Sequence, residues 1–132
     1  MYYNNMWEFN GVAFTEDMIE DYIGFVYILE HRDTGLKYIG KKNFYSHAKS
    51  RITGKKTKTI SLWKNYYGSS SKTKALVKEY GAESFVRTIL HLCKSKREMS
   101  YLEEKEQFSQ DVLRNDDYLN DNIGLRHYRT KL

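Results

Sequence analysis

The chain has 132 residues, of which 40% are hydrophobic and 30% are charged, and its formal net charge is +5. This composition excludes a disordered or fibrous protein and fits a single globular domain over residues 1–132. The one cysteine, Cys93, excludes an internal disulfide, and no apolar run approaches the roughly 18 residues of a membrane span, so we expect a cytoplasmic protein without a membrane partner.

The first 23 residues are expected to form an amino-terminal extension. Their opening stretch, "MYYNNMWEFNG", has neither the basic start nor the apolar run of a signal peptide. Thr15 is a suitable N-cap, and Glu16 and Asp17 follow it where the helix dipole favours acidic side chains. A short helix at about 15–22 is therefore predicted.

Residues 24–30 ("GFVYILE") and 36–42 ("LKYIGKK") are rich in β-branched and aromatic residues and predict two strands. The intervening "RDTG" fits a four-residue hairpin loop, which would place Tyr38 opposite Leu29. Tyr27 and Tyr38 would then be diagonal neighbours on one face, about 7–8 Å apart. A three-residue loop would instead put them on opposite faces. Two buried strand tyrosines are the ordinary alternative to a functional pair.

The stretch from Thr34 to Lys78 contains no acidic residue, although the chain has 17. A one-sided positive field with interleaved aromatic rings is typical of proteins that bind nucleic acids, although solvated lysines are also common. Residues 43–68 have little periodicity and predict a basic, partly irregular segment with a possible helical turn. The lysines that we expect to contact nucleic acid are Lys41, Lys42, Lys49, Lys55, Lys56 and Lys58.

The remaining elements are a helix, a strand and a second helix. "GSSSKTKALVKEYG" has serines suited to capping, and Ser69 and Ser70 could alternatively contact phosphate at the helix start. "SFVRTILHL" (84–92) predicts a third strand, and Ser95 can cap a helix over about 96–114. The expected fold class is α+β, with a small, mainly antiparallel three-stranded sheet (a β-hairpin plus one strand) flanked by helices.

The last helix carries three candidate carboxylates. Glu104 lies opposite its apolar face and fits a solvated charge, whereas Glu106 lies within that face, which is costly unless it is paired or the stripe opens there. Glu103 lies at the margin, where a carboxylate can touch a cleft and keep water nearby, as Mg²⁺ sites require. The family resemblance described next implies a metal-binding glutamate on this helix, and for that role we rank Glu103 first, Glu106 second and Glu104 third. An unremarkable amphipathic helix is the alternative.

The motifs "FVY" (25–27) and "YIG" (38–40), with ten residues between their tyrosines, resemble the paired signature of the GIY-YIG endonucleases. Phe-Val replaces Gly-Ile in the first motif. The resemblance covers about residues 24–123, and "YIGKK", "WKNYYGSSS" and "YLEEKEQF" look closest to the phage-encoded, Seg-like branch related to homing endonucleases.

The resemblance implies a GIY-YIG-like fold and hydrolysis of DNA phosphodiester bonds with Mg²⁺ or Mn²⁺. It implies catalytic roles for Tyr27 and Tyr38, and a metal-binding role for Glu103. Arg51 is the preferred match for the family's phosphate-binding arginine, with Lys42 and Lys49 as substitutes. Asn120 resembles the family's terminal asparagine and is expected at the DNA, although such residues also form ordinary turns.

Two other functions stay open at this point. A non-catalytic basic module would bind nucleic acid without cutting it, and a protein-interaction domain would bind an acidic partner. The chain ends soon after Asn122, so we expect specificity for double-stranded DNA to come from the domain itself, from a homodimer or from an accessory protein. Whether one strand or both are cut is not indicated.

Overall fold

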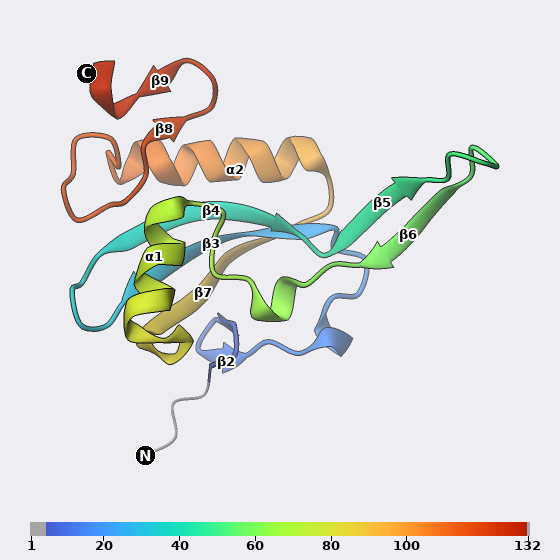
Figure 1. The fold of residues 1–132 in the computed structure, drawn as a ribbon, viewed down its shortest axis with the longest axis horizontal. Helices are drawn as coiled ribbons and strands as arrows, with labels where there is room; N and C mark the ends of the chain where they lie inside the picture. Colours follow the sequence, from blue (N-terminus) through green and yellow to red (C-terminus); the bar gives the residue numbers. More distant parts are fainter. Residues whose placement is uncertain (1–4, 132) are drawn as a thin grey trace.

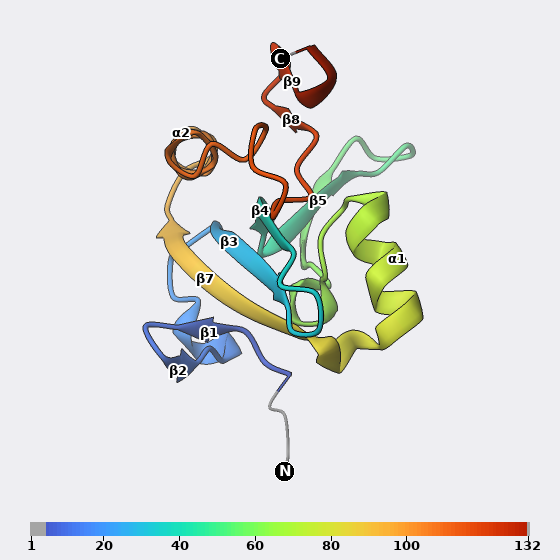
Figure 2. The ribbon, with the colours of Figure 1, turned by 90° about the vertical axis from the view of Figure 1, so that its left-hand side faces the viewer.

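The computed structural model describes residues 5–131 and has an α+β architecture. Its main sheet is mixed, with the strand order β2-β1-β7-β3-β4. These strands are β1 (Glu8–Phe9), β2 (Val12–Ala13), β3 (Gly24–His31), β4 (Lys37–Asn43) and β7 (Phe85–Cys93). Helices α1 (Ser71–Tyr80) and α2 (Lys96–Ser109) lie on opposite faces of the sheet (Figure 2). No helix in the described range is long and apolar enough to cross a membrane.

Two further hairpins and four short 3-10 helices complete the fold. Strands β5 (Tyr45–Lys49) and β6 (Lys56–Ile60) pair with each other alone and project from the body of the molecule (Figure 1). Strands β8 (Asn122–Ile123) and β9 (His127–Tyr128) form the second hairpin near the carboxyl terminus. The 3-10 helices are Glu16–Met18, Trp63–Asn65, Ala82–Ser84 and Arg129–Lys131.

The β3–β4 hairpin has the predicted register. Leu29 pairs with Tyr38 and Tyr27 pairs with Gly40, as a four-residue loop requires. The backbone N–H of His31 donates to the carbonyl of Leu36, which closes that loop at 2.8 Å. The diagonal placement of Tyr27 and Tyr38 on one face is therefore confirmed.

Alternation along β3 divides the core into two clusters. Phe25, Tyr27 and Leu29 face α1 and pack with Trp7 and Trp63 in the larger, aromatic cluster. The opposite face packs under α2 through a smaller cluster, whose strand and helix members include Val26, Ile39 and Met99. Because α1 and α2 lie on different faces, side chains from the two faces can meet only at the edge of the sheet, which β4 forms.

The three expected strands are present as β3, β4 and β7, and they pair antiparallel as predicted. The expected strand number is wrong, because β1 and β2 extend the sheet to five strands and β1 runs parallel to β7. Two-residue strands are too short to show a period in the sequence. The helix expected at about 15–22 is also wrong, since only Glu16–Met18 forms a 3-10 turn. Glu20 has a φ of 49°, which a right-handed helix does not allow.

Two other boundaries differ from expectation. Residues 43–68 are expected to be partly irregular, and no strand is predicted there, but they contain β5 and β6. The 3-10 helix Trp63–Asn65 supplies the expected helical turn. The last helix ends at Ser109 instead of 114, because Asp111 adopts a left-handed φ of 50°. The predicted capping by a serine before α1 and by Ser95 before α2 is confirmed, since the Ser70 and Ser95 hydroxyls accept from backbone N–H groups in the first turn of each helix.

The outer edge of β4 is covered along its first half by the loop after α2. The backbone of Lys37 exchanges hydrogen bonds with Asp117 and Leu119, both at 2.7 Å. Next along the strand, the Asn120 amide accepts from the Ile39 N–H at 3.1 Å and donates to the Ile39 carbonyl at 2.8 Å. The buried Gln107 amide donates to the same carbonyl at 3.0 Å. The loop after α2 does not extend beyond Ile39, so it does not cover β4 from Gly40 onward.

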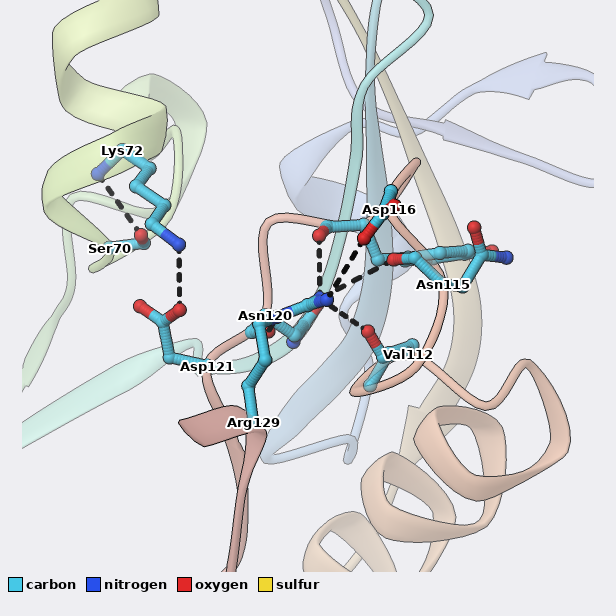
Figure 3. Close-up of polar contacts among 9 residues, drawn as sticks. Ser70, Lys72, Val112, Asn115, Asp116, Asn120, Asp121 and Arg129 are labelled. Atoms are coloured by element: carbon cyan, nitrogen blue, oxygen red, sulfur yellow. Dashed lines mark hydrogen bonds and ion pairs between the residues drawn. The ribbon is translucent and has the colours of Figure 1, made fainter. Parts of the chain in front are cut away.

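Arg129 holds that loop in place from the carboxyl-terminal side (Figure 3). Its guanidinium donates to the carbonyls of Asn120 at 3.0 Å and Tyr118 at 2.8 Å, and also to the carbonyl of Val112. One planar cation therefore joins the turn at the end of α2 to the stretch that covers β4.

We expect Asn120→Ala to lower the free energy of unfolding by about 1–3 kcal/mol, because the buried Ile39 N–H loses its acceptor. Urea denaturation measures the change. Asn122→Ala is the matched control, since its amide bonds only to the exposed Gly124 carbonyl. A loss for Asn120→Ala no larger than for the control would contradict the edge-covering role.

Candidate active site

Three tyrosines meet on the α1 face of the sheet beside the uncovered part of β4. The rings of Tyr27 and Tyr38 have centroids 6.4 Å apart, and Tyr66 packs edge-on against Tyr27 at 5.8 Å. Tyr27 is only 1% exposed, whereas Tyr38 and Tyr66 are half-buried. Tyr66 was not among the sequence-predicted site residues. Its signal was its position among the aromatic residues of the acid-free stretch.

Gly40 explains why the second motif ends in glycine. A Cβ at this position would lie 2.5 Å from the Tyr27 hydroxyl oxygen and 3.0 Å from Cε1 of Tyr38. No rotamer change can relieve contacts this short while the two rings stay in place. The missing side chain therefore leaves the space in which the Tyr27 phenol lies, directly across the hairpin.

The tyrosine hydroxyls are held in their protonated form. Burial, followed by the neighbouring Tyr66 and Tyr38 hydroxyls, raises the pKa of Tyr27 well above its usual value. Burial also raises the pKa of Tyr38, and a hydrogen bond with Ser69 partly offsets the shift. At neutral pH both groups are phenols that can donate hydrogen bonds.

Glu103 approaches the same edge from the other face, on α2. Its carboxylate lies 3.8 Å from the Lys41 ammonium, which also donates to the Ser100 hydroxyl at 2.9 Å. The Glu103 side chain is 18% exposed. Burial raises the pKa of its carboxyl group, Lys41 opposes that rise and Glu104 adds to it. The charge on Glu103 also contributes to the raised pKa of Tyr27 and Tyr38, so the three groups share one electrostatic environment.

The other two carboxylates of α2 point elsewhere. Glu106 lies 2.8 Å from the Nε2 atom of His91, which supplies the partner that its position on the helix required. Glu104 is half-buried beside Gly124, in a groove that also includes Phe108 and His127. Among the described residues, neither Glu104 nor Glu106 interacts with Tyr27 or Tyr38.

Ser69 and Ser70 lie between Tyr38 and the start of α1. The Ser70 hydroxyl accepts from the Lys72 N–H at 3.1 Å and is occupied as a cap, while Ser69 is exposed beside the Tyr38 hydroxyl. Figure 3 shows Lys72 reaching from this helix to Asp121, at 2.6 Å. Asn120 is 2% exposed with its amide bonded to Ile39, so we assign it to the edge of β4 and not to contact with DNA.

The basic residues fall into two groups. Lys41 and Lys42 lie on β4 at the site, and the Lys42 ammonium sits 4.5 Å from the centre of the Tyr66 ring. Arg51 lies in the exposed loop that joins β5 to β6, at the far end of the projecting hairpin (Figure 1). Lys49, Lys55, Lys56 and Lys58 belong to that hairpin or its loop. The structure therefore does not bring Arg51 together with Tyr27, Tyr38 and Glu103.

The residues at this edge fit a divalent cation that takes some of its ligands from the protein and the rest from water and a substrate. Mg²⁺ commonly takes one or two protein carboxylates and completes its shell with water and phosphate oxygens. Glu103 supplies one such carboxylate, half-buried and next to an open strand edge. Within residues 5–131 there is no group of three or more His, Cys, Asp or Glu side chains that could hold a metal by themselves.

Comparison with known families gives a match over most of the chain. The family model "Putative endonuclease segE, GIY-YIG domain" matches residues 7–123. The match includes β1 and β2 as well as the paired tyrosine motifs, and it ends with β8. No curated protein and no solved structure matches the chain.

We expect Gly40→Ala to destabilise the fold by about 1–3 kcal/mol through overpacking against the Tyr27 ring. The same substitution should cost clearly less in a Tyr27→Leu background, because leucine lacks the ring atoms that the new Cβ would meet. Chemical denaturation of the four proteins gives this double-mutant cycle. Equal costs in both backgrounds would show that the phenol does not require the glycine.

We expect Glu103→Gln to keep or slightly raise the free energy of unfolding at pH 7. A raised carboxyl pKa means that ionisation of Glu103 disfavours the folded state above that pKa, and glutamine removes the charge. The difference from the parent protein should vanish as the pH falls below about 4, where the unfolded carboxyl is also protonated. Thermal denaturation at both pH values checks this, with Glu104→Gln as the control. A large loss of stability at pH 7 would contradict it.

Proposed function

The chain belongs to the SegE GIY-YIG endonuclease domain family, and on that premise we propose that it hydrolyses DNA phosphodiester bonds with the help of a divalent metal ion. GIY-YIG nucleases are phosphodiesterases, so the reaction class follows from the family. The observation that carries the proposal is the convergence of Tyr27, Tyr38 and Glu103 on one open strand edge, together with Lys41 and Lys42.

In this proposal the tyrosines act as neutral hydrogen-bonding groups. Because its pKa is raised, Tyr27 keeps its proton at neutral pH and does not supply a phenolate. Tyr27 orders the hydroxyl of Tyr66, with which it forms a hydrogen bond, and the half-buried Tyr38 and Tyr66 hydroxyls meet the attacking water and the phosphate. Fixed donors at a phosphate lower the barrier without having to reorganise during the reaction.

Glu103 is proposed to hold Mg²⁺ or Mn²⁺, with Lys41 released from its ion pair when the cation binds. A bound cation would polarise the scissile phosphate and stabilise the leaving oxygen. In the released state Lys41 can contact a phosphate oxygen, as a compact charge with three donors. This assigns two alternative partners to Lys41, one in the free protein and one in the complex.

Lys42 takes the phosphate-binding role that the family gives to an arginine. It lies at the site over the Tyr66 ring, whereas Arg51 lies in the loop at the end of the β5–β6 hairpin. An ammonium provides charge but not the two parallel hydrogen bonds of a guanidinium. Arg51 is left as a contact to DNA away from the cleaved bond.

Three finer features are part of the proposal. The substrate is double-stranded DNA, the protein works in the manner of phage homing-type endonucleases, and it acts in the cytoplasm of the host cell. Specificity beyond this domain would come from a homodimer or from an accessory protein. Both a nicking and a double-strand activity are compatible with one such site per chain.

We expect the parent protein to nick supercoiled plasmid with Mg²⁺ and not with a chelator. Tyr27→Phe should retain folding and DNA affinity but cleave about 10²–10³-fold more slowly, since the Tyr66 hydroxyl loses the hydrogen bond that orders it. Glu103→Gln should lose most cleavage, whereas Tyr101→Phe, on the exposed side of α2, should cleave normally.

Binding of DNA without nicking by the parent protein would leave a non-catalytic binding module. Normal cleavage by Tyr27→Phe would return Tyr27 to a role in the core alone. Cleavage lost in Glu106→Gln but not in Glu103→Gln would place the metal ligand one turn further along α2.

A further inference from the structure

The β5–β6 hairpin, residues 45–60, is here called the ribbon. It pairs with no other strand, and every side chain of β6 is exposed (Figure 1). A two-stranded ribbon with so little buried apolar surface is marginally stable at best. Its length and projection therefore need an explanation other than packing.

The pairing register sorts the ribbon's side chains by charge. His47 pairs with Lys58 and Lys49 pairs with Lys56, so these four side chains lie on one face, which we call the basic face. Ser46, Ala48, Thr57 and Thr59 lie on the other face of the two strands. The basic residues are thus not spread around the ribbon as solvated charges would be.

This sorting has an electrostatic cost. Like charges directly opposite each other across two strands are destabilising, and Lys49 faces Lys56 in that way. None of the ion pairs among the described residues involves the ribbon, and the acid-free stretch around it offers no carboxylate. Lys58 rests on the Tyr45 ring, 4.1 Å from its centre, and remains exposed. An anionic partner would remove the repulsion.

A groove runs between the basic face and the beginning of α2. One part, of about 360 Å³, is lined by His47, Ala48, Lys49, Lys56 and Lys96. The next part, of about 200 Å³, shares His47 and Lys96 and continues past Lys58 to Ser95. Its lining contains no acidic side chain. Lys96, from α2, adds a cation that sequence analysis did not assign to the DNA surface.

We propose that the basic face and Lys96 hold the phosphate backbone of double-stranded DNA in this groove, away from the bond that is cut. The proposal rests on the proposed function for the identity of the partner. Same-face residues recur about every 7 Å along a strand, a spacing comparable to that of successive phosphates. The opposite face of the ribbon makes no contact with DNA, so one face alone sets how the duplex lies across the molecule.

The test compares two variants with the same net charge change on the same strand. Lys56→Gln/Lys58→Gln removes two charges from the basic face, and Thr57→Glu/Thr59→Glu adds two acids to the opposite face. Fluorescence anisotropy with a duplex, without divalent metal and at several salt concentrations, gives the slope of log K against log[salt]. The first variant should lower the magnitude of this slope by up to about 1.8, at about 0.9 per lost phosphate contact.

The second variant should change the slope by less than half as much, because its acids point away from the duplex. A second pair on α2 repeats the comparison with single charges: Lys96→Gln should weaken binding, and the exposed Lys105→Gln should not. Circular dichroism verifies that all four variants are folded.

Equal losses on both faces would overturn the proposal, because net charge alone would explain them. Unchanged affinity in every variant would also overturn it and would leave an acidic protein as the partner of the ribbon. The parent protein's nicking activity is read in parallel. If only the basic-face variant binds more weakly and the parent protein does not nick, the groove proposal is supported and the nuclease proposal is refuted. If the parent protein nicks but both variants bind alike, the nuclease proposal is supported and the groove proposal is refuted.

Discussion

The Tyr27 phenol lying over the bare backbone of Gly40 is the contact on which the rest of the site depends. Direct pairing of these two residues fixes the register of the β3–β4 hairpin, and that register puts Tyr38 diagonally beside Tyr27. A shift by one residue would send one tyrosine to the face of α2. The aromatic cluster beneath, with Trp7 and Phe25 against Tyr27, then holds the phenol in a single position.

A strand edge is an unusual place for a site because it exposes unpaired backbone groups. Here the loop after α2 pairs with Lys37, and the amides of Asn120 and Gln107 satisfy Ile39, so the edge is closed up to Gly40. Closing this half protects the strand from pairing with another chain. The open half that follows is reached from both faces of the sheet, by tyrosines on one side and by Glu103 on the other. This topology brings side chains from both faces of the sheet to one point.

Sequence reasoning succeeded where structure is local and failed where it depends on partners distant in the chain. The hairpin register followed from the length of "RDTG", and the partner needed by Glu106 followed from its position on the helix. β1 was missed because a two-residue strand becomes one only beside β7. The ribbon was missed because it buries no apolar face, and a hydrophobic period appears in a sequence only where one face of an element is buried. The position of Arg51 could not be predicted for the same reason, since the residues after "YIG" form strands that place it in the loop at the end of the ribbon.

The same limits apply to the assigned roles. Asn120 could be recognised from its sequence context, but its role could not, because that role depends on Ile39 lying on the edge strand β4 of the sheet. Tyr66 and Lys96 lie far from the paired motifs in sequence, and only folding brings them to the tyrosines and to the ribbon. Family membership supplies the reaction class, and the geometry supplies the residues that we propose for it.

The most direct test of the site locates the metal ion. Mn²⁺ can be titrated into the slow Tyr27→Phe variant bound to duplex DNA, and amide resonances followed by heteronuclear NMR as the paramagnetic ion broadens nearby signals. A cation held by Glu103 at the open edge of β4 should broaden Gly40, Lys41 and Glu103 first and leave the ribbon sharp. Early broadening confined to the acidic loop of Asp116, Asp117 and Asp121, with Gly40 and Glu103 unaffected, would contradict the assignment of the active site.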